Sequence, residues 1–166
     1  MTPVIHNPVS GERIVIRQTS AQTGGRLLSF DLFLRPGGHV PAGHVHPEQE
    51  ERFTVVAGRM RFLIGRRTIL AGPGETVCIP AGISHWFGNA GTDVAHTRVE
   101  VRPALRMEEL LERTGRLGAH GPRLPDLALV LLEFQRELAV PNVPAFLVRT
   151  VLAPLAWVAR HRAHQV

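Results

Sequence analysis

The sequence predicts a mainly β protein, a sandwich or closed jelly roll of short strands, followed by a C-terminal α-helical region. Between residues 12 and 102, short runs rich in β-branched and aromatic residues alternate with glycine- and proline-containing turns, which is typical of such folds. Beyond residue 104 the apolar residues recur at a helical period instead. The chain has 166 residues, of which 44% are hydrophobic and 20% charged. This composition suits one compact core and excludes a disordered chain.

The expected strands follow one another at short intervals through the first region. The run 28–34 alternates between apolar and other residues, and residues 36–38 break it. Residues 53–57 and 60–64 flank Gly58-Arg59, which indicates a tight hairpin. Further strands are expected at residues 13–17, 68–70, 76–79, 85–87 and 94–101, separated by turns at 71–74 and 80–82.

Two helices are expected after the strands. Residues 104–113 mix leucines with glutamates and predict a short helix that ends near Gly115, and residues 114–125 read as a loop. Residues 126–139 predict a second helix. Its apolar residues almost encircle it, so we expect it to be buried against the strands or against a second subunit.

A last helix is expected over residues 143–160. Asn142 is a candidate for its N-cap, and Pro154 should kink or split it. The change of period divides the chain into a β domain, residues 1–103, and a helical extension, residues 104–166.

Composition narrows the classes of function. The net charge is +5 and every basic residue is an arginine, but the arginines are scattered, so we expect no nucleic-acid partner. The absence of lysine excludes Schiff-base and P-loop chemistry. The single cysteine, Cys78, excludes a disulfide framework and suits a reducing cytoplasm. We expect neither a signal peptide nor a membrane span, since no apolar run reaches about 18–20 residues.

Histidines and a carboxylate lie close together near the centre of the β region. His44 and His46 are two residues apart, so on an extended strand they point to the same side. Glu51 opens the next predicted strand. Imidazole nitrogen and carboxylate oxygen are ligands for one divalent metal ion such as Fe, Mn, Ni or Zn. Structural zinc sites usually contain paired cysteines, so this pattern favours a metal with open coordination positions.

The choice of carboxylate depends on strand register. Glu48 and Glu50 lie near Glu51, but Glu50 would face the opposite side of the strand. The remaining histidines are expected at the surface or in satisfied core positions; they are His6, His39, His96, His120, His161 and His164.

Two spaced patterns carry a resemblance to a known family. The first reads Gly38-x5-His44-x-His46-x4-Glu51-x6-Gly58, and the second reads Gly74-x5-Pro80-x-Gly82-x2-His85-x3-Asn89. Together they resemble both signature motifs of the cupin superfamily, with every position filled and in the correct order. The resemblance covers roughly residues 25–105, about half of the chain. The helical extension lies outside it.

The resemblance implies a cupin-type double-stranded β-helix, a jelly-roll barrel that often dimerises. It implies that the first motif supplies three metal ligands, His44, His46 and Glu51, and that His85 supplies the fourth. Cupins include dioxygenases, isomerases, cyclases, decarboxylases and non-enzymatic binders, so the family leaves the reaction open.

Pocket residues follow from strand alternation. If Glu51 and His85 point inward, then Phe53 and Phe87 do so as well, and Met60 and Phe62 share the inner face of their strand. These four are the candidate substrate-binding residues. The resulting pocket is apolar, which favours a small organic substrate.

Two classes of function remain. The first is a metal-dependent enzyme, with an Fe-type oxygenase ahead of a redox-silent isomerase or cyclase. The second is a non-catalytic protein that binds a small molecule or a metal. In either class we expect a cytoplasmic homodimer with a small-molecule ligand.

Overall fold

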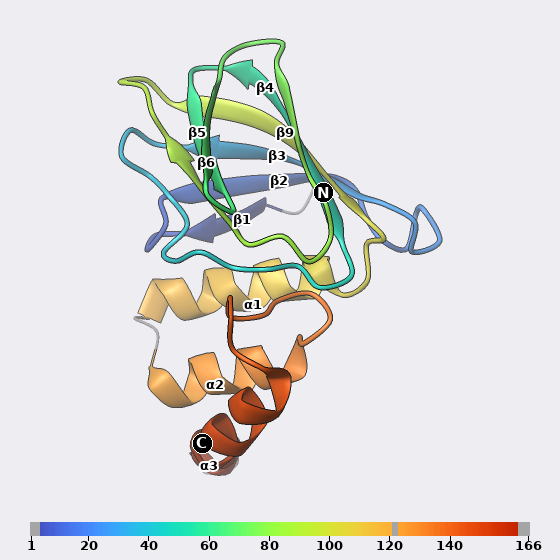
Figure 1. Cartoon of the computed structure of the whole chain (residues 1–166), viewed down its shortest axis with the longest axis vertical. Coiled ribbons are helices and arrows are strands. Elements are labelled where there is room, and N and C mark those ends of the chain that lie inside the picture. The colour runs from blue at the N-terminus through green and yellow to red at the C-terminus, as the bar shows by residue number, and fades with distance from the viewer. Residues whose placement is uncertain (1–3, 121–122, 163–166) are drawn as a thin grey trace.

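In the part of the chain that the structure describes, nine strands form two antiparallel sheets and three helices follow them (Figure 1). The computed structural model describes residues 4–120 and 123–162. The strands are β1 (Val4–Asn7), β2 (Glu12–Gln18), β3 (Leu28–Leu34), β4 (Glu50–Ala57), β5 (Met60–Ile64), β6 (Arg67–Ala71), β7 (Thr76–Ile79), β8 (His85–Asn89) and β9 (Ala95–Arg102). The helices are α1 (Met107–His120), α2 (Leu124–Glu133) and α3 (Ala145–Arg162). The mainly β architecture with a helical C-terminal region is therefore confirmed.

The larger sheet has the strand order β1-β2-β3-β9-β4-β7, and the smaller sheet has the order β6-β5-β8. Neighbours such as β4 and β9 are far apart in sequence, which is the crossing connectivity of a jelly roll. Along β4 the residues Glu51, Phe53 and Val55 are buried. They alternate with residues that reach the outer surface, so one face of each strand builds the barrel interior.

The hairpin between β4 and β5 turns at Gly58, whose φ is +78°. A β-carbon on this residue would lie 2.8 Å from the Cα of Ala95 on β9. Both the left-handed backbone and the close approach require glycine here.

The first helix differs from the sequence prediction. α1 runs from Met107 to His120, through Gly115 and into residues 114–125, where a loop was predicted. A β-carbon on Gly115 would lie 2.7 Å from Cγ2 of Ile5 on β1, a strand that the sequence analysis did not identify. Gly115 therefore allows α1 to pack closely on β1, and the prediction that it ends the helix was wrong.

The later helices also have different bounds. α2 ends at Glu133 and not at 139, because Ala139 pairs with Val45 through reciprocal backbone hydrogen bonds of 2.9 and 3.1 Å. α3 is one helix with Pro154 inside it, and packing on α2 buries its Ala156. Asn142 has a positive φ of 59° and lies in the preceding turn, so it does not cap α3.

The helical extension shares its core with the barrel. α1 crosses one end of the barrel, and α2 lies on the far side of α1 from the strands (Figure 1). One cluster of buried apolar residues includes side chains from the strands and from the helical extension. The extension contributes Met107 and Leu110 of α1, Val130 of α2, and Phe134 at the end of α2. Among the described helices, none is long and apolar enough to cross a membrane.

Phe134 offers a test of how much this shared core contributes. Its side chain is fully buried, and the guanidinium of Arg106 lies 4.6 Å from its ring centroid. We expect Phe134→Ala to lower the free energy of unfolding by about 3–5 kcal/mol, since it opens a cavity between α2 and the barrel. Urea denaturation measures this change. Leu70 on β6 is 57% exposed, and Leu70→Ala is the control that should leave the midpoint nearly unchanged.

Candidate metal centre

The predicted ligands are brought together by backbone pairing between segments that are distant in sequence. His44 and His46 lie between β3 and β4, Glu51 lies in β4, and His85 begins β8. The amide of His44 donates to the carbonyl of His85, and the amide of His85 donates to the carbonyl of His44, both at 2.9 Å. Glu51 pairs with Ile79 of β7 on one side and with Val101 of β9 on the other. Because β4 is held by a neighbouring strand on each side, the side chain of Glu51 is kept pointing into the barrel.

One donor atom from each of the four side chains lies within 4.8 Å of the other three. Oε2 of Glu51 is 3.1 Å from Nε2 of His85 and 3.3 Å from Nε2 of His46. The ring of His44 lies 4.4 Å from the ring of His85, centroid to centroid. Glu51, His46 and His85 are buried, and His44 is half-buried at the edge of the group.

Each of the three imidazoles has its Nδ1 against a backbone carbonyl oxygen. Nδ1 of His44 lies 3.3 Å from the carbonyl oxygen of Ala42, and Nδ1 of His85 lies 3.0 Å from that of Ile83. Nδ1 of His46 contacts the carbonyl oxygen of Glu137. A carbonyl can only accept, so each Nδ1 carries a proton, and Nε2 of His46 and of His85 faces Oε2 of Glu51. Metal-ligating histidines are oriented in this way in proteins.

The acceptor for His46 comes from the helical extension. Glu137 follows α2, and its buried carboxylate accepts from the backbone amide of Arg106 at 3.1 Å. The extension therefore contributes directly to the orientation of one candidate ligand, a role that could not be predicted from the sequence.

Electrostatics keep a negative charge on Glu51 and leave His44 uncharged. Burial lowers the pKa of His44 to about 3, helped by the nearby His46 and His85, so this imidazole is neutral at pH 7. Burial alone would raise the pKa of Glu51, but the adjacent imidazoles of His46 and His85 outweigh it and hold that pKa far below 4.5. Burial likewise opposes a charge on His46, yet the Glu51 carboxylate raises the pKa of His46.

The donor set fits a divalent transition metal. Three imidazole nitrogens and one ionised carboxylate converge, and each imidazole has an outer hydrogen-bond partner. The neighbouring carboxylates lie elsewhere: Glu48 pairs with Arg136, and Glu50 lies 3.7 Å from Arg52. The chemistry of the group, rather than proximity alone, therefore supports Glu51 as the fourth ligand.

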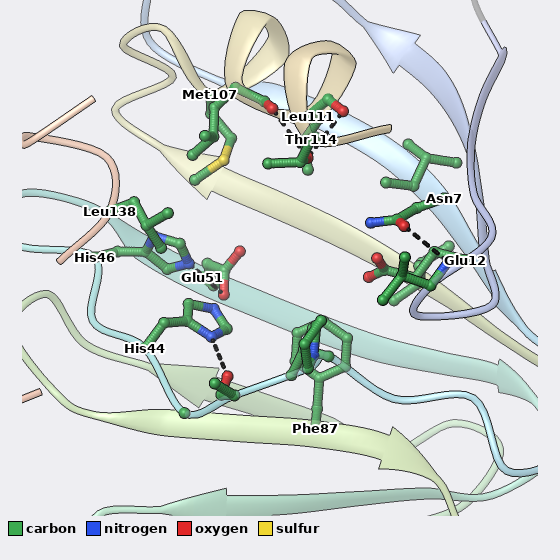
Figure 2. Close-up of a pocket in the computed structure, with 18 of the residues that line it drawn as sticks. Asn7, Glu12, His44, His46, Glu51, Phe87, Met107, Leu111, Thr114 and Leu138 are labelled. Carbon is green, nitrogen blue, oxygen red and sulfur yellow. Dashed lines mark hydrogen bonds and ion pairs between the residues drawn. The ribbon is translucent and has the colours of Figure 1, made fainter. Parts of the chain in front are cut away.

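The candidate centre lies on the wall of a cavity of about 440 Å³ between the barrel and the helices (Figure 2). Its lining is mostly apolar and comes from both parts of the chain. The barrel side contributes Ile14, Phe30, Leu32, Val40, Phe53 and Phe87. The helical extension contributes Met107, Leu110, Leu111, Thr114, Leu117, Leu127, Leu131, Leu138, Ala139 and Val140.

The residues proposed for the pocket divide into two pairs. Phe53 and Phe87 line the cavity, as do His44, His46 and Glu51. Met60 and Phe62 are fully buried but do not line it. The ring of Phe62 packs 5.2 Å from Phe53 and 6.3 Å from Phe87, so it supports the cavity wall from behind.

Sequence reasoning missed the polar residues at the other end of the cavity. Asn7 and Glu12 line it, and they are paired across the β1–β2 hairpin. The sequence had predicted an apolar pocket. Nothing in the local sequence could have revealed Glu12, because it reaches the cavity only after β2 has paired with β3.

Glu12 lies in an environment that disfavours its charge. Burial raises the pKa of Glu12 above 4.5 and the charge of Glu51 adds to this, while a hydrogen bond from Oγ of Ser10 at 2.5 Å opposes it. The folded protein therefore holds this proton to higher pH than the unfolded chain does.

The raised pKa of Glu12 predicts that the free energy of unfolding decreases as the pH rises. As the pH rises above 4.5 the unfolded chain releases the Glu12 proton first, so the free energy of unfolding falls until the folded carboxyl ionises as well. We expect Glu12→Gln to raise the melting temperature little near pH 4 and more at pH 7. Thermal melts across this range test it, with the exposed loop variant Asp93→Asn as control. An equal effect of Glu12→Gln at every pH would contradict the assignment.

The comparisons with known proteins agree with this geometry. The family model of the cupin domain matches residues 31–101, which include all four candidate ligands and end before α1. Residues 31–101 of the chain therefore form a cupin domain. No curated protein matches the chain.

Solved structures share the barrel. A predicted oxalate decarboxylase from Thermotoga maritima superposes with a TM-score of 0.56 at 18% identity, covering 62% of this chain and 92% of that one. The protein Ylba from E. coli gives 0.53 at 17% identity, covering 62% of this chain and 42% of that one. The cupin domain of Cnp3 from Schizosaccharomyces pombe gives 0.51 at 9% identity, covering 59% and 69%. At these identities the likeness shows the fold alone.

Proposed function

We propose that this protein is a metal-dependent enzyme, an Fe-type oxygenase that acts on a small, largely apolar organic substrate. One observation carries the proposal. Three imidazoles and one carboxylate converge, and His44, His46 and Glu51 of this group line a largely apolar cavity of about 440 Å³. Ligand cavities of this size and character are typical of small-molecule sites.

In this proposal, one group of residues holds the metal and another binds the substrate. His44, His46, Glu51 and His85 would hold the metal. A divalent metal in this group would supply Lewis acidity, and iron would also supply electrons for reaction with O2. The apolar body of the substrate binds between two groups of side chains, which also exclude water. These are Phe53 and Phe87 on the barrel side and the leucines of α1 and α2 on the other side. Water exclusion strengthens every electrostatic interaction inside the cavity.

A second candidate is a redox-silent isomerase or cyclase, in which the metal acts only as a Lewis acid. Glu12 supports it, because it places a carboxyl group with a raised pKa in the same cavity. Such a group can take up or release a proton during the reaction.

Elemental analysis of the untagged, full-length protein tests the proposal. We expect about one divalent metal ion per chain, since the group offers one set of ligands. If the metal is iron, anaerobic protein mixed with O2 and a panel of aromatic and ketonic compounds should consume O2 in step with substrate loss. Zinc with no O2 uptake, but with interconversion of a substrate, would favour the isomerase. Protein without metal, or with metal and no turnover of any compound, would favour a non-catalytic binder.

The assembly and its location complete the proposal. We propose a homodimer, supported by apolar side chains of Phe146, Leu147 and Val151 that α3 leaves exposed. A cytoplasmic location is supported by the single cysteine, which is exposed and unpaired as Cys78.

A further inference from the structure

The cavity has two polar ends. At one end lie His44, His46 and Glu51, and across the cavity lie Asn7 and Glu12 (Figure 2). The remaining polar side chain in the lining, Thr114, donates within α1 to the carbonyls of Leu110 and Leu111 at 3.0 and 3.1 Å. The wall between the two ends is therefore apolar in character.

The second polar end has hydrogen-bonding capacity that the protein does not use. Oε2 of Glu12 accepts from Ser10 at 2.5 Å, and Oδ1 of Asn7 accepts from the amide of Val9 at 3.2 Å. Among residues 4–120 and 123–162, neither Oε1 of Glu12 nor Nδ2 of Asn7 has a protein hydrogen-bond partner. The amide nitrogen of Asn7 points toward the cavity (Figure 2).

A purely structural role does not account for this carboxyl group. The next residue on the same face of β2 is Ile14, and the facing residues Phe30 and Leu32 of β3 are apolar. An apolar side chain would fit this wall without the cost of burying an ionisable group. Buried polar groups in apolar pockets commonly fix the orientation of a ligand.

We propose that Glu12 and Asn7 form a second anchoring point that binds a hydroxyl group of the ligand, at the end of the cavity opposite the metal ligands. A hydroxyl group uses both unpaired atoms, since its hydrogen is donated to Oε1 of Glu12 and its oxygen accepts from Nδ2 of Asn7. The inference rests on the proposed function for the other end, where an oxygen group of the same ligand meets the metal. The ligand is thus a small apolar skeleton with an oxygen function at each end.

Matched pairs of ligands test the anchor directly. The probes are ω-hydroxy carboxylic acids of increasing chain length and the corresponding unsubstituted acids, titrated calorimetrically into the full-length, metal-loaded protein. At the chain length that spans the cavity, we expect the hydroxy acid to bind about tenfold more tightly than its unsubstituted partner. Glu12→Leu should abolish or reverse this preference, because leucine leaves the hydroxyl unpaired and favours the apolar acid.

Companion variants separate anchoring from folding. Glu12→Gln keeps a hydrogen-bonding group and should retain part of the preference, and Asn7→Ala should weaken it. Asp93→Leu replaces an exposed loop carboxylate and should leave it unchanged. Melting temperatures establish that each variant is folded. The comparison of the two acids on the unaltered protein remains decisive even if Glu12→Leu does not fold.

Two readouts distinguish failure of this inference from failure of the proposed function. Metal content is measured on every sample. If the protein contains metal but binds neither acid, or binds both acids equally, the proposed hydroxyl-binding role of Glu12 and Asn7 is wrong. The proposed metal centre is not contradicted by that result. Protein without metal that still prefers the hydroxy acid, and loses this preference in Glu12→Leu, supports the anchor and overturns the metal-dependent function.

Discussion

Replacing His85 by alanine should leave the protein with almost no bound metal. His85 contributes one of the four converging donors, and its side chain also lies 3.1 Å from Glu51, the only carboxylate of the group. Loss of an outer partner of a metal ligand already costs about 10–100-fold in affinity, so loss of the ligand should cost at least about 100-fold. Elemental analysis after dialysis against a fixed free-metal concentration measures the effect. Replacement of His44, His46 or Glu51 should act in the same direction.

Two control variants define the register of the site. Glu48→Ala removes a carboxylate three residues before Glu51 that is paired with Arg136 at the surface. His96→Ala removes an imidazole that stacks on Phe33 with centroids 4.4 Å apart and lies 3.3 Å from Asp31. Both variants should keep their metal. Metal loss in Glu48→Ala, with retention in Glu51→Ala, would show that the wrong carboxylate has been assigned.

A chain that ends at Arg102 should aggregate or change its oligomeric state, and should bind metal weakly. The truncation removes Met107, Leu110 and Phe134 from the core and opens the cavity to solvent. It also removes the carbonyl of Glu137 that orients His46. Exposed apolar surface is unfavourable by roughly 25 cal/mol per Å², so the uncovered barrel end should seek another partner. Light scattering and elemental analysis measure the two effects.

A chain that ends at Asn142 is the matched control. It keeps α1, α2 and the backbone pairing of Val45 with Ala139, and it removes only α3. We expect this chain to retain its metal, because every contact to the candidate centre is preserved. A barrel ending at Arg102 that keeps the oligomeric state and metal affinity of the full chain would show that the helices are an independent module.

Spacing within strands indicated the directions of His44, His46 and Glu51, and the resemblance to the cupin motifs added His85 as a candidate ligand. His44 and His46 are two residues apart on an extended segment, so their side chains point to the same side. Side chains alternate between the two faces of β4, so Glu51 points inward and Glu50 points outward. The prediction that Glu51 rather than Glu48 faces the cluster agrees with the positions of both carboxylates. Alternation also placed Phe53 inward, but it could not tell a side chain that lines the cavity from one behind the wall, such as Phe62.

The helix boundaries were harder to predict because tertiary contacts override local signals. Glycine often ends a helix, and Gly115 follows the predicted helix closely enough to be taken as its end. In the structure β1 lies so close to Gly115 that a larger residue would clash, so glycine here allows α1 to continue past β1. Residues after Glu133 favour helix locally, but the pairing of Ala139 with Val45 ends α2 early. Pro154 lies inside α3, where packing on α2 holds one continuous helix.

The sequence by itself determined the strand-rich region, the helical extension and the set of residues that could hold a metal. The two regions depend on residue periods that are local along the chain, and the set of candidate ligands depends on two spaced motifs that resemble those of cupins. Only the tertiary structure decided what the extension does: it closes the cavity, and it supplies the carbonyl that orients His46. It also decided that Glu12 and Asn7 face the candidate metal ligands across an apolar space. Such contacts join residues far apart in sequence, and they exist only once the sheets have paired and the helices have packed on them.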